Sequence, residues 1–221
     1  MSGPGDGDEP FDLGLFGAVP VGRALERWGA LRRATGMPRA VHARQVHGAR
    51  VLAHGDGPPG LLVSEGYDGH WTDVPGVLLT VSVADCVPIF LVDPERRAVA
   101  VLHAGWRGVA AGMLEAGLRA LAAGAGSRPQ DVRGHFGPAI CGACYEVGPE
   151  VHEALGLPVP AGPTPVDLRA ELARRALSLG VPAEAVTLSE HCTRCTGSPL
   201  FSHRGGDAAR QMGFIGIRPD A

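Results

Sequence analysis

Three residues of types that bind metals stand at the ends of expected strands, beside a glycine or close to a proline: His47, Cys86 and His103. Two imidazoles and a thiolate are good zinc ligands, and three protein ligands leave a fourth coordination position open, which is the pattern of a catalytic zinc. The same set suits type-1 copper, which takes two His and one Cys with a weak axial Met. The alternative is a buried cysteine and two core histidines. Spacing alone favours that alternative, because ligands 39 and 17 residues apart match no short metal motif.

The other four cysteines form two Cys-x-x-Cys pairs: Cys141 with Cys144, and Cys192 with Cys195. Four thiolates in two such pairs can make a closed, structural zinc site. The 47 residues between the pairs exceed the gap of a zinc ribbon. Turns with free thiols, or a redox pair, are therefore kept as alternatives.

Four arginines in or near Gly-rich turns are candidates for holding phosphate or a carboxylate: Arg44, Arg107, Arg204 and Arg210. The guanidinium fork matches such anions, although a solvated or structural role is the alternative for each. Arg107 is the strongest candidate, because it follows His103 at the expected start of a helix, where free N–H groups attract anions. Asp85, next to Cys86, can orient a metal ligand or a substrate amine, or cap a turn.

A β-hairpin is expected to bring part of this set together. Strands over 87–92 and 98–102, joined by a turn at 93–97, predict that Val92 faces Ala98 and Val87 faces His103. Facing residues lie roughly 5 Å apart, so Cys86 and His103 are expected to meet at one end of the hairpin. A single apolar helix over 106–123 is expected to follow.

The remaining pattern favours an α+β fold, because strands and helices are mixed without a regular βαβ alternation. An amphipathic helix is expected over 21–36, with Leu25, Trp28 and Leu31 on its apolar face, and a second over 168–179, capped by Asp167. Further strands are expected at 11–16, 40–46, 50–53, 77–83, 132–136, 186–189, 200–203 and 213–217. We expect a loose tail over 1–10 and one domain over 11–221, because the chain after the Pro-rich loop 156–165 is short for an independent core.

Composition excludes several kinds of chemistry. The chain contains no lysine, so a P-loop lysine, a kinase lysine and a Schiff-base lysine are all ruled out. A net charge of −3 offers no basic face for nucleic acid. The first ten residues lack the features of a signal peptide, and Asp85 and Pro88 interrupt the longest apolar stretch, so no membrane span is expected. We expect a cytosolic protein, in which cysteines serve as ligands, nucleophiles or packing residues rather than disulfides.

Seven segments, in order over residues 40–217, resemble the YfiH-like family, whose members go under the names polyphenol oxidase or laccase-domain protein, peptidoglycan editing factor and purine nucleoside phosphorylase. They are RQVHG (44–48), VADCVPIFLVDP (83–94), HAGWRG (103–108), GPAICGACYEVG (137–148), VDL (166–168), CT (192–193) and FSHR (201–204). The most specific is ADC followed by HAGWRG.

The resemblance implies one α+β domain with two mixed sheets packed between helix layers, in the order α/β/β/α. It implies a zinc held by the His of QVHG, the Cys of ADC and the His of HAGW, which are His47, Cys86 and His103 here. It also implies phosphorolysis of adenosine, inosine and methylthioadenosine, with adenosine deamination as a second activity. The chain departs from the family in its short front, in His203 where Tyr is frequent, and in Ala209 where Gly is usual. These departures bear on substrate preference more than on metal binding.

The leading hypothesis is therefore a zinc-dependent purine nucleoside enzyme that acts on a small nucleoside and phosphate, with Arg107 holding the phosphate. A copper polyphenol oxidase is the second hypothesis, although laccases also need a trinuclear cluster fed by His-x-His pairs, and the sequence has none. A third is a cysteine amidohydrolase for peptidoglycan precursor editing, with Cys86 as nucleophile and His103 as base. A non-enzymatic binding module is the fourth.

Overall fold

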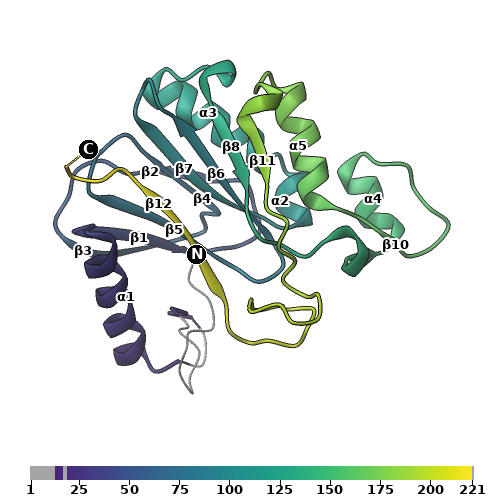
Figure 1. Ribbon diagram of the computed structural model, residues 1–221, viewed down its shortest axis with the longest axis horizontal. Coiled ribbons are helices and arrows are strands. Elements are labelled where there is room, and N and C mark those ends of the chain that lie inside the picture. The colour runs from purple at the N-terminus through teal and green to yellow at the C-terminus, as the bar shows by residue number, and fades with distance from the viewer. Residues whose placement is uncertain (1–12, 17–18, 221) are drawn as a thin grey trace.

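Two mixed β-sheets form the centre of the fold (Figure 1). The computed structural model describes residues 13–16 and 19–220. Sheet A runs in the order β12 (Gln211–Gly216), β5 (Val77–Val83), β1 (Arg39–Arg44) and β3 (Gly60–Glu65). Sheet B runs in the order β11 (Val186–Leu188), β8 (Arg133–Phe136), β6 (Val87–Asp93), β7 (Ala98–Ala104), β4 (Gly69–Thr72) and β2 (Val51–Ala53). A small antiparallel ribbon pairs β9 (Glu146–Val147) with β10 (Thr164–Pro165).

Helices cover the outer faces of both sheets (Figure 1). Sheet A carries α1 (Val21–Thr35), and the helices on the side of sheet B are α2 (Trp106–Ala110), α3 (Met113–Ala125), α4 (Pro149–Leu155) and α5 (Leu168–Ser178). Short 3-10 turns are η1 (Pro129–Asp131), η2 (Gly142–Cys144) and η3 (Ala183–Ala185). Separate apolar clusters lie between α1 and sheet A, between the sheets, and between sheet B and its helices. The predicted single-domain α+β fold with layers α/β/β/α is confirmed.

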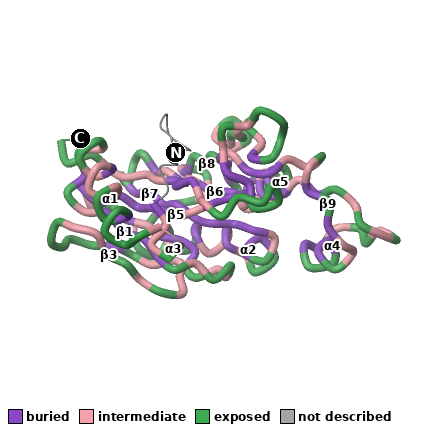
Figure 2. The backbone as a smooth tube through the Cα atoms, turned by 90° about the horizontal axis from the view of Figure 1, so that it is seen from below, coloured by how far each residue is buried: buried purple, intermediate pink, exposed green. Residues whose placement is uncertain are grey.

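The central strands are apolar on both faces because each sheet packs against the other sheet on one face and against helices on the other. In β5, Leu78 packs with the α1 cluster while its neighbour Leu79 packs between the sheets. In β7, Val101 points between the sheets while Leu102 joins the cluster beneath the helices. Side chains alternate across a strand, so both faces must be apolar when both are buried. Figure 2 shows that β5 and β7 are buried along most of their length.

The first helix forms as expected but turns a different face inward. Its buried residues are Ala24, Trp28 and Leu31, at a spacing of four and then three residues. Leu25, which was expected on the apolar face, is 50% exposed. The indole of Trp28 donates a hydrogen bond to the carbonyl of Leu13, which ties the segment before the helix to it. A left-handed Gly36 ends the helix.

The hairpin of β6 and β7 is present, and its register differs by one residue from the prediction. Asp93 pairs with Ala98, so Pro88 rather than Val87 faces His103. The Asp93 carboxylate accepts hydrogen bonds from the backbone of Glu95 and Arg96. This side chain holds the turn, and a turn one residue shorter than expected shifts every pair along the hairpin.

Two further predictions were wrong in detail. The helix expected over 106–123 is broken into α2 and α3, because Gly112 adopts a left-handed backbone. The strand expected at 200–203 is a loop and turn, whose backbone bonds to side chains instead of a neighbouring strand. The Phe201 amide donates to the side chain of Gln211, and the Ser202 amide donates to Asp207. By contrast, Asp167 caps α5 as predicted.

The N-terminal predictions are only partly covered by the described residues. The loose tail over 1–10 and residues 11–12 of the expected first strand lie outside them. Residues 13–16 form no strand. In the part of the chain that the structure describes, no helix has the length and apolar character needed to cross a membrane.

Candidate metal centre and its cavity

The turn that carries His47 is held by one buried carboxylate. Asp68, between β3 and β4, accepts hydrogen bonds from the consecutive amides of Val46 (3.2 Å), His47 (2.8 Å) and Gly48 (2.9 Å). His47 has a φ of 59°, a left-handed conformation that is uncommon for a residue with a side chain. The three amides converge on the carboxylate because of this turn, and they hold the backbone of His47 in place.

The same carboxylate orients His103 at the end of β7. Oδ1 of Asp68 lies 2.9 Å from Nδ1 of His103, and the Asp68 carbonyl accepts from the His103 amide at 2.7 Å. Both side chains are buried. A proton on Nδ1 that is donated to Asp68 leaves Nε2 with its lone pair, which is how carboxylates commonly orient histidine ligands of zinc.

Cys86 lies between β5 and β6, directly after a strained residue. Asp85 has a φ of 80°, and both oxygens of its carboxylate are engaged: Oδ1 accepts from the Thr193 hydroxyl at 2.6 Å, and Oδ2 from the Arg204 amide at 2.7 Å. The Asp85 carbonyl accepts from the amide of Ile140. Asp85 therefore joins three distant segments around Cys86.

The ligand atoms of His47, Cys86 and His103 all lie within 4.8 Å of one another. Burial would raise the pKa of the Cys86 thiol, but the neighbouring His103 and His47 lower it to about 6. Burial would lower the pKa of His103, but Cys86 and Asp68 raise it to about 9. At neutral pH the metal-free cluster therefore pairs an anionic sulfur with a protonated His103. A metal ion would displace the proton from Nε2 of His103, and the resulting set of one thiolate and two imidazoles suits zinc or copper.

Gly105 leaves the space that this cluster needs. A Cβ atom at that position would lie 2.8 Å from the sulfur of Cys86 and 3.3 Å from the ring of His47. Its backbone is extended, with φ −79° and ψ 176°, so the requirement for glycine comes from the approach of the two side chains. The residues present therefore fit a metal ion in both chemistry and space.

A cavity of about 350 Å³ opens beside the cluster, within the range of roughly 300–1,000 Å³ that is typical of small-molecule sites. Two arginines stand on its wall, each against an aromatic ring. The guanidinium of Arg107 lies 4.3 Å from the Trp106 ring, and that of Arg204 lies 4.9 Å from the Tyr145 ring. The full lining is His47, Ala84, Asp85, Cys86, Gly105, Trp106, Arg107, Ile140, Tyr145, Leu168, His203 and Arg204.

The other two candidate arginines lie elsewhere. Arg44 stands over the ring of Phe16, and Arg210 donates to backbone carbonyls of its own turn at 207–209. Neither lines the cavity. The expected helix start also needs correction, because α2 has only five residues and so offers little dipole to an anion. Any anion beside the cluster would depend on the side chains of Arg107 and Arg204.

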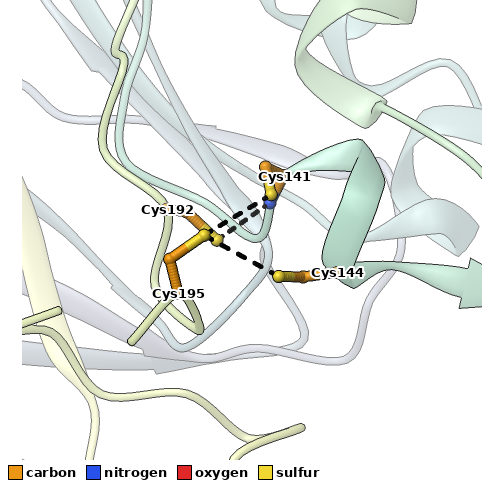
Figure 3. Close-up of side chains that lie close together, drawn as sticks. All are labelled: Cys141, Cys144, Cys192 and Cys195. Atoms are coloured by element: carbon orange, nitrogen blue, oxygen red, sulfur yellow. Dashed lines mark hydrogen bonds between the residues drawn. The ribbon is translucent and has the colours of Figure 1, made fainter. Parts of the chain in front are cut away.

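The structure also brings Cys141, Cys144, Cys192 and Cys195 together, as a second cluster whose sulfur atoms lie within 4.8 Å of one another (Figure 3). A larger hollow of about 670 Å³ lies along β8 and β11, lined by residues such as Phe90, His135 and Thr187. No residue of the His47–Cys86–His103 cluster or of the four-cysteine cluster lines that hollow. The smaller cavity, which borders His47 and Cys86, is therefore the candidate functional site.

Sequence reasoning missed Asp68, Trp106 and Tyr145. Asp68 carried one weak signal, since it is an acidic residue directly before the short strand β4, whose sequence, GHWT, is largely buried but not apolar. Its pairing with residues 20 and 35 positions away could not be read from that signal. The two aromatic residues lie within the quoted motifs HAGWRG and GPAICGACYEVG. Trp106 is the sequence neighbour of Arg107, but nothing predicts that their side chains stack or that Tyr145 meets Arg204.

Comparison with known proteins places this arrangement in a family. A family model described as multi-copper polyphenol oxidoreductase laccase matches residues 23–218. The chain belongs to this family. Among the relatives of this laccase-family protein is a purine nucleoside phosphorylase, YlmD of Geobacillus stearothermophilus, which is 35% identical over 218 residues, covering 90% of this chain and 78% of the relative.

Two further similarities are informative. A relative named adenosine deaminase RL5, from an unknown prokaryotic organism, is 34% identical over 194 residues, covering 80% of this chain and 74% of the relative. The crystal structure of YlmD from Geobacillus stearothermophilus superposes with a TM-score of 0.89 at 30% identity, covering 99% of this chain and 89% of that one. The laccase-family chain thus has relatives named for two reactions on purine nucleosides.

Proposed function

We propose that this protein is a zinc-dependent purine nucleoside phosphorylase that also deaminates adenosine. In the first reaction, phosphate would replace the purine at C1′ of the ribose, giving free base and ribose 1-phosphate. In the second, water would replace the amino group at C6 of adenine, giving inosine and ammonia. The observation that carries the proposal is the His47–Cys86–His103 cluster, which borders a cavity with two arginines on its wall.

The three cluster residues would hold the zinc ion. Bound there, zinc would act as a Lewis acid and would activate water near neutral pH. Asp68 would keep the proton of His103 on Nδ1, which presents Nε2 to the ion. The three backbone amides that donate hydrogen bonds to Asp68 would keep His47 facing the metal position.

Phosphate would bind to the guanidinium groups of Arg107 and Arg204. Each group rests on an aromatic ring, which restricts its motion and lowers the entropy lost when an anion binds. The Arg204 side chain also donates to the Glu146 carbonyl at 3.0 Å, which fixes its direction further. Without any lysine in the chain, arginine must supply the positive charge for such an anion.

The purine would lie against the aromatic and aliphatic part of the wall, where Trp106, Ile140 and Leu168 are found. Burial, with the nearby Cys86 sulfur, raises the pKa of Tyr145 to about 12. Tyr145 therefore keeps its phenolic proton at neutral pH, so its hydroxyl can donate a hydrogen bond to a ring nitrogen or a ribose oxygen.

A copper oxidase is the second candidate, because the family description names that activity. Such an enzyme needs further histidines gathered around a second copper cluster. Among the described residues the other buried histidines are engaged away from the cavity: His54 with His70, His42 with Thr80, and His152 with the Thr164 carbonyl. The donor sets found in that part of the chain are the two cysteine-containing clusters alone. This distribution favours the nucleoside reaction.

The test is to incubate the purified protein with adenosine, with and without phosphate, and to separate the products by chromatography. We expect adenine and ribose 1-phosphate only when phosphate is present, and inosine in either case. Loss of both activities on chelation and their return with zinc would support the metal's role. Absence of all these products would overturn the proposal. Activity that survives in metal-free protein but not in Cys86→Ser would point instead to Cys86 as a nucleophile.

A further inference from the structure

Four cysteines gather where two distant segments cross. Cys141 directly precedes the turn η2 and Cys144 is its last residue, while Cys192 and Cys195 come from the segment after β11 (Figure 3). The sulfur of Cys195 lies 3.9 Å from that of Cys141 and 3.8 Å from that of Cys144. All four are free thiols, and their sulfur atoms lie within 4.8 Å of one another.

These separations match a shared metal ion better than disulfides. Four sulfurs that each lie about 2.3 Å from a tetrahedral zinc are about 3.8 Å apart from one another. A disulfide would bring two of them to about 2.05 Å. Two of the six sulfur–sulfur distances, at 3.8 Å and 3.9 Å, lie at the edge length of the tetrahedron, and none exceeds 4.8 Å. The side chains therefore surround a point that a single ion can occupy.

Backbone amides further support thiolates at this place. The Cys141 amide donates to the sulfur of Cys192 at 3.3 Å, and the Arg194 amide donates to the same sulfur at 3.4 Å. Hydrogen bonds from N–H groups stabilise the anionic form of sulfur, which is the form that binds metals. This pair of donors comes from both segments, so the arrangement needs both in place.

We propose that Cys141, Cys144, Cys192 and Cys195 bind one structural zinc ion. Thiolates select soft or borderline metals, and four protein ligands close the coordination sphere against water and substrate. This ion is separate from the one proposed at His47, Cys86 and His103, since the two clusters share no residue.

The zinc ion would fasten one wall of the catalytic cavity. Cys192 forms a parallel bridge with Ala139, and the Thr193 amide donates to the Ala139 carbonyl at 3.2 Å. The Thr193 hydroxyl then donates to Asp85, the residue before Cys86. Tyr145, which follows Cys144, lines the cavity itself. The effect on catalysis rests on the proposed function, whereas the presence of the ion does not.

The test is elemental analysis of the full chain, purified under reducing conditions, beside two variants. Cys144→Ser/Cys195→Ser should contain about one zinc ion per chain fewer than the wild type. Cys86→Ser, the matched control, should keep the ion of the four-cysteine cluster. If the proposed catalytic metal is wrong but this inference holds, the wild type contains about one ion, which Cys86→Ser keeps and the double variant loses. Equal metal content in the wild type and the double variant would overturn the inference.

Two measurements on the wild type keep the inference testable if the double variant fails to fold. Titration with a thiol-modifying reagent should release about one zinc ion as four thiols react. A single free thiol in the denatured, unreduced protein would mean two disulfides and would overturn the inference. The structural role has its own readout, which is hydrogen exchange. Removal of the ion should speed exchange of the Ile140 and Thr193 amides several-fold and leave β6 and β7 unchanged, whereas unchanged exchange throughout would contradict that role.

Discussion

Asp68 accepts a hydrogen bond from Nδ1 of His103 through Oδ1, at 2.9 Å, and the same oxygen accepts from the backbone amide of His47 at 2.8 Å. One buried carboxylate thus fixes two of the three residues in the cluster. Burial would raise the pKa of Asp68, but the bonds from His103 and from the Gly48 amide hold it below its usual value. The negative charge of Asp68 is therefore part of the site.

Replacing that charge should weaken metal binding while keeping the shape of the side chain. In Asp68→Asn, a single carbonyl oxygen replaces the two carboxylate oxygens that accept hydrogen bonds from His103 and the three backbone amides. The new NH₂ group is itself a donor and would face some of these N–H groups. We expect zinc affinity to fall about 10- to 100-fold, as is typical when a partner of a ligating histidine is lost. Competition with a chromogenic chelator measures this affinity. Asp73→Asn, at an exposed position, is the control, and equal affinities in the two variants would contradict a role for Asp68.

A methyl group at position 105 should disturb the cluster without straining the backbone. In Gly105→Ala, the added Cβ would stand 2.8 Å from the sulfur of Cys86, so the thiol must move. We expect this variant to lose most of the metal bound at His47, Cys86 and His103, and to keep any ion at the four-cysteine cluster, while its Tm stays within a few degrees of the wild type. Elemental analysis and calorimetry check the two halves of the prediction. Gly162→Ala, where an added Cβ meets nothing within 4 Å, should change neither quantity.

The two reactions should separate when Arg107 is changed. Phosphorolysis needs phosphate and deamination does not, so loss of a guanidinium that binds phosphate affects the first reaction alone. For Arg107→Gln we expect the KM for phosphate to rise about ten-fold or more, as loss of a charge-assisted hydrogen bond implies. Steady-state kinetics with varied phosphate measure it, beside deamination of adenosine. Arg119→Gln, exposed on α3, is the control, and an equal loss of both reactions in Arg107→Gln would contradict this role.

The parts of this site that local sequence could predict are those within a few residues of each other. The His103–Trp106–Arg107 segment follows a strand, and Cys86 precedes another, so a hairpin alone brings Cys86 near His103. The predicted proximity of Cys86 and His103 holds although the predicted register was wrong by one residue, because both lie at the same end of the hairpin. Residue type and position at a strand end made His47 a candidate ligand, but only the family resemblance predicted that it lies beside the other two, since its contact depends on how β1 and β7 pack in different sheets.

What the sequence could not predict depends on side chains that replace backbone pairing. The segment 200–203 has the apolar residues of a strand, yet Gln211 and Asp207 occupy its amides. Gly112 was read as one more residue of an apolar helix, although its left-handed backbone divides α2 from α3. Tertiary hydrogen bonds decide the structure of 200–203, and the backbone conformation of one glycine decides where α2 ends. Local propensity predicts neither of these features.

A buried histidine outside the site should make stability depend on pH. His42 lies against Trp28, and burial lowers its pKa from 6.5 to about 4 despite a bond to Thr80 that favours the charged form. The Thr80 hydroxyl donates to the Val41 carbonyl, so Nδ1 of His42 must carry the proton and donate to Thr80. Between pH 6.5 and about 4 the unfolded chain binds a proton at His42 and the folded chain does not. The free energy of unfolding must therefore fall as pH falls through this window.

His42→Asn keeps a donor near the position of Nδ1 and removes the titration. We expect the stability of the wild type to fall by roughly 3 kcal/mol more than that of the variant between pH 7 and pH 4. Urea unfolding at several pH values measures the difference. His191→Asn, at an exposed position, should give a curve parallel to the wild type. A His42→Asn curve that is also parallel would show that His42 titrates normally in the folded protein.

Two neighbouring arginines on α5 allow a matched test of what joins the helices. Both donate to Glu171, but Arg175 also donates to the carbonyl of Val109, at the end of α2, and to that of Leu155, at the end of α4. Its side chain is 17% exposed, whereas that of Arg174 is 63% exposed. Removing Arg175 would leave the buried Leu155 carbonyl without this donor and the Val109 carbonyl with the amide of Gly112, while removing Arg174 breaks an ion pair that water can replace.

We expect Arg175→Ala to lower the free energy of unfolding by about 3 kcal/mol and Arg174→Ala by less than about 1 kcal/mol. Urea unfolding of both variants measures the contrast. Each substitution also removes a partner of Glu171, to which Arg174 donates two hydrogen bonds and Arg175 one, so the effect on that carboxylate does not account for a larger loss in Arg175→Ala. What remains is the contribution of the two carbonyl bonds and of the 3.8 Å ion pair between Arg175 and Glu115. Equal losses would show that α2 and α4 are held against α5 by apolar packing alone, and that Arg175 contributes only its charge.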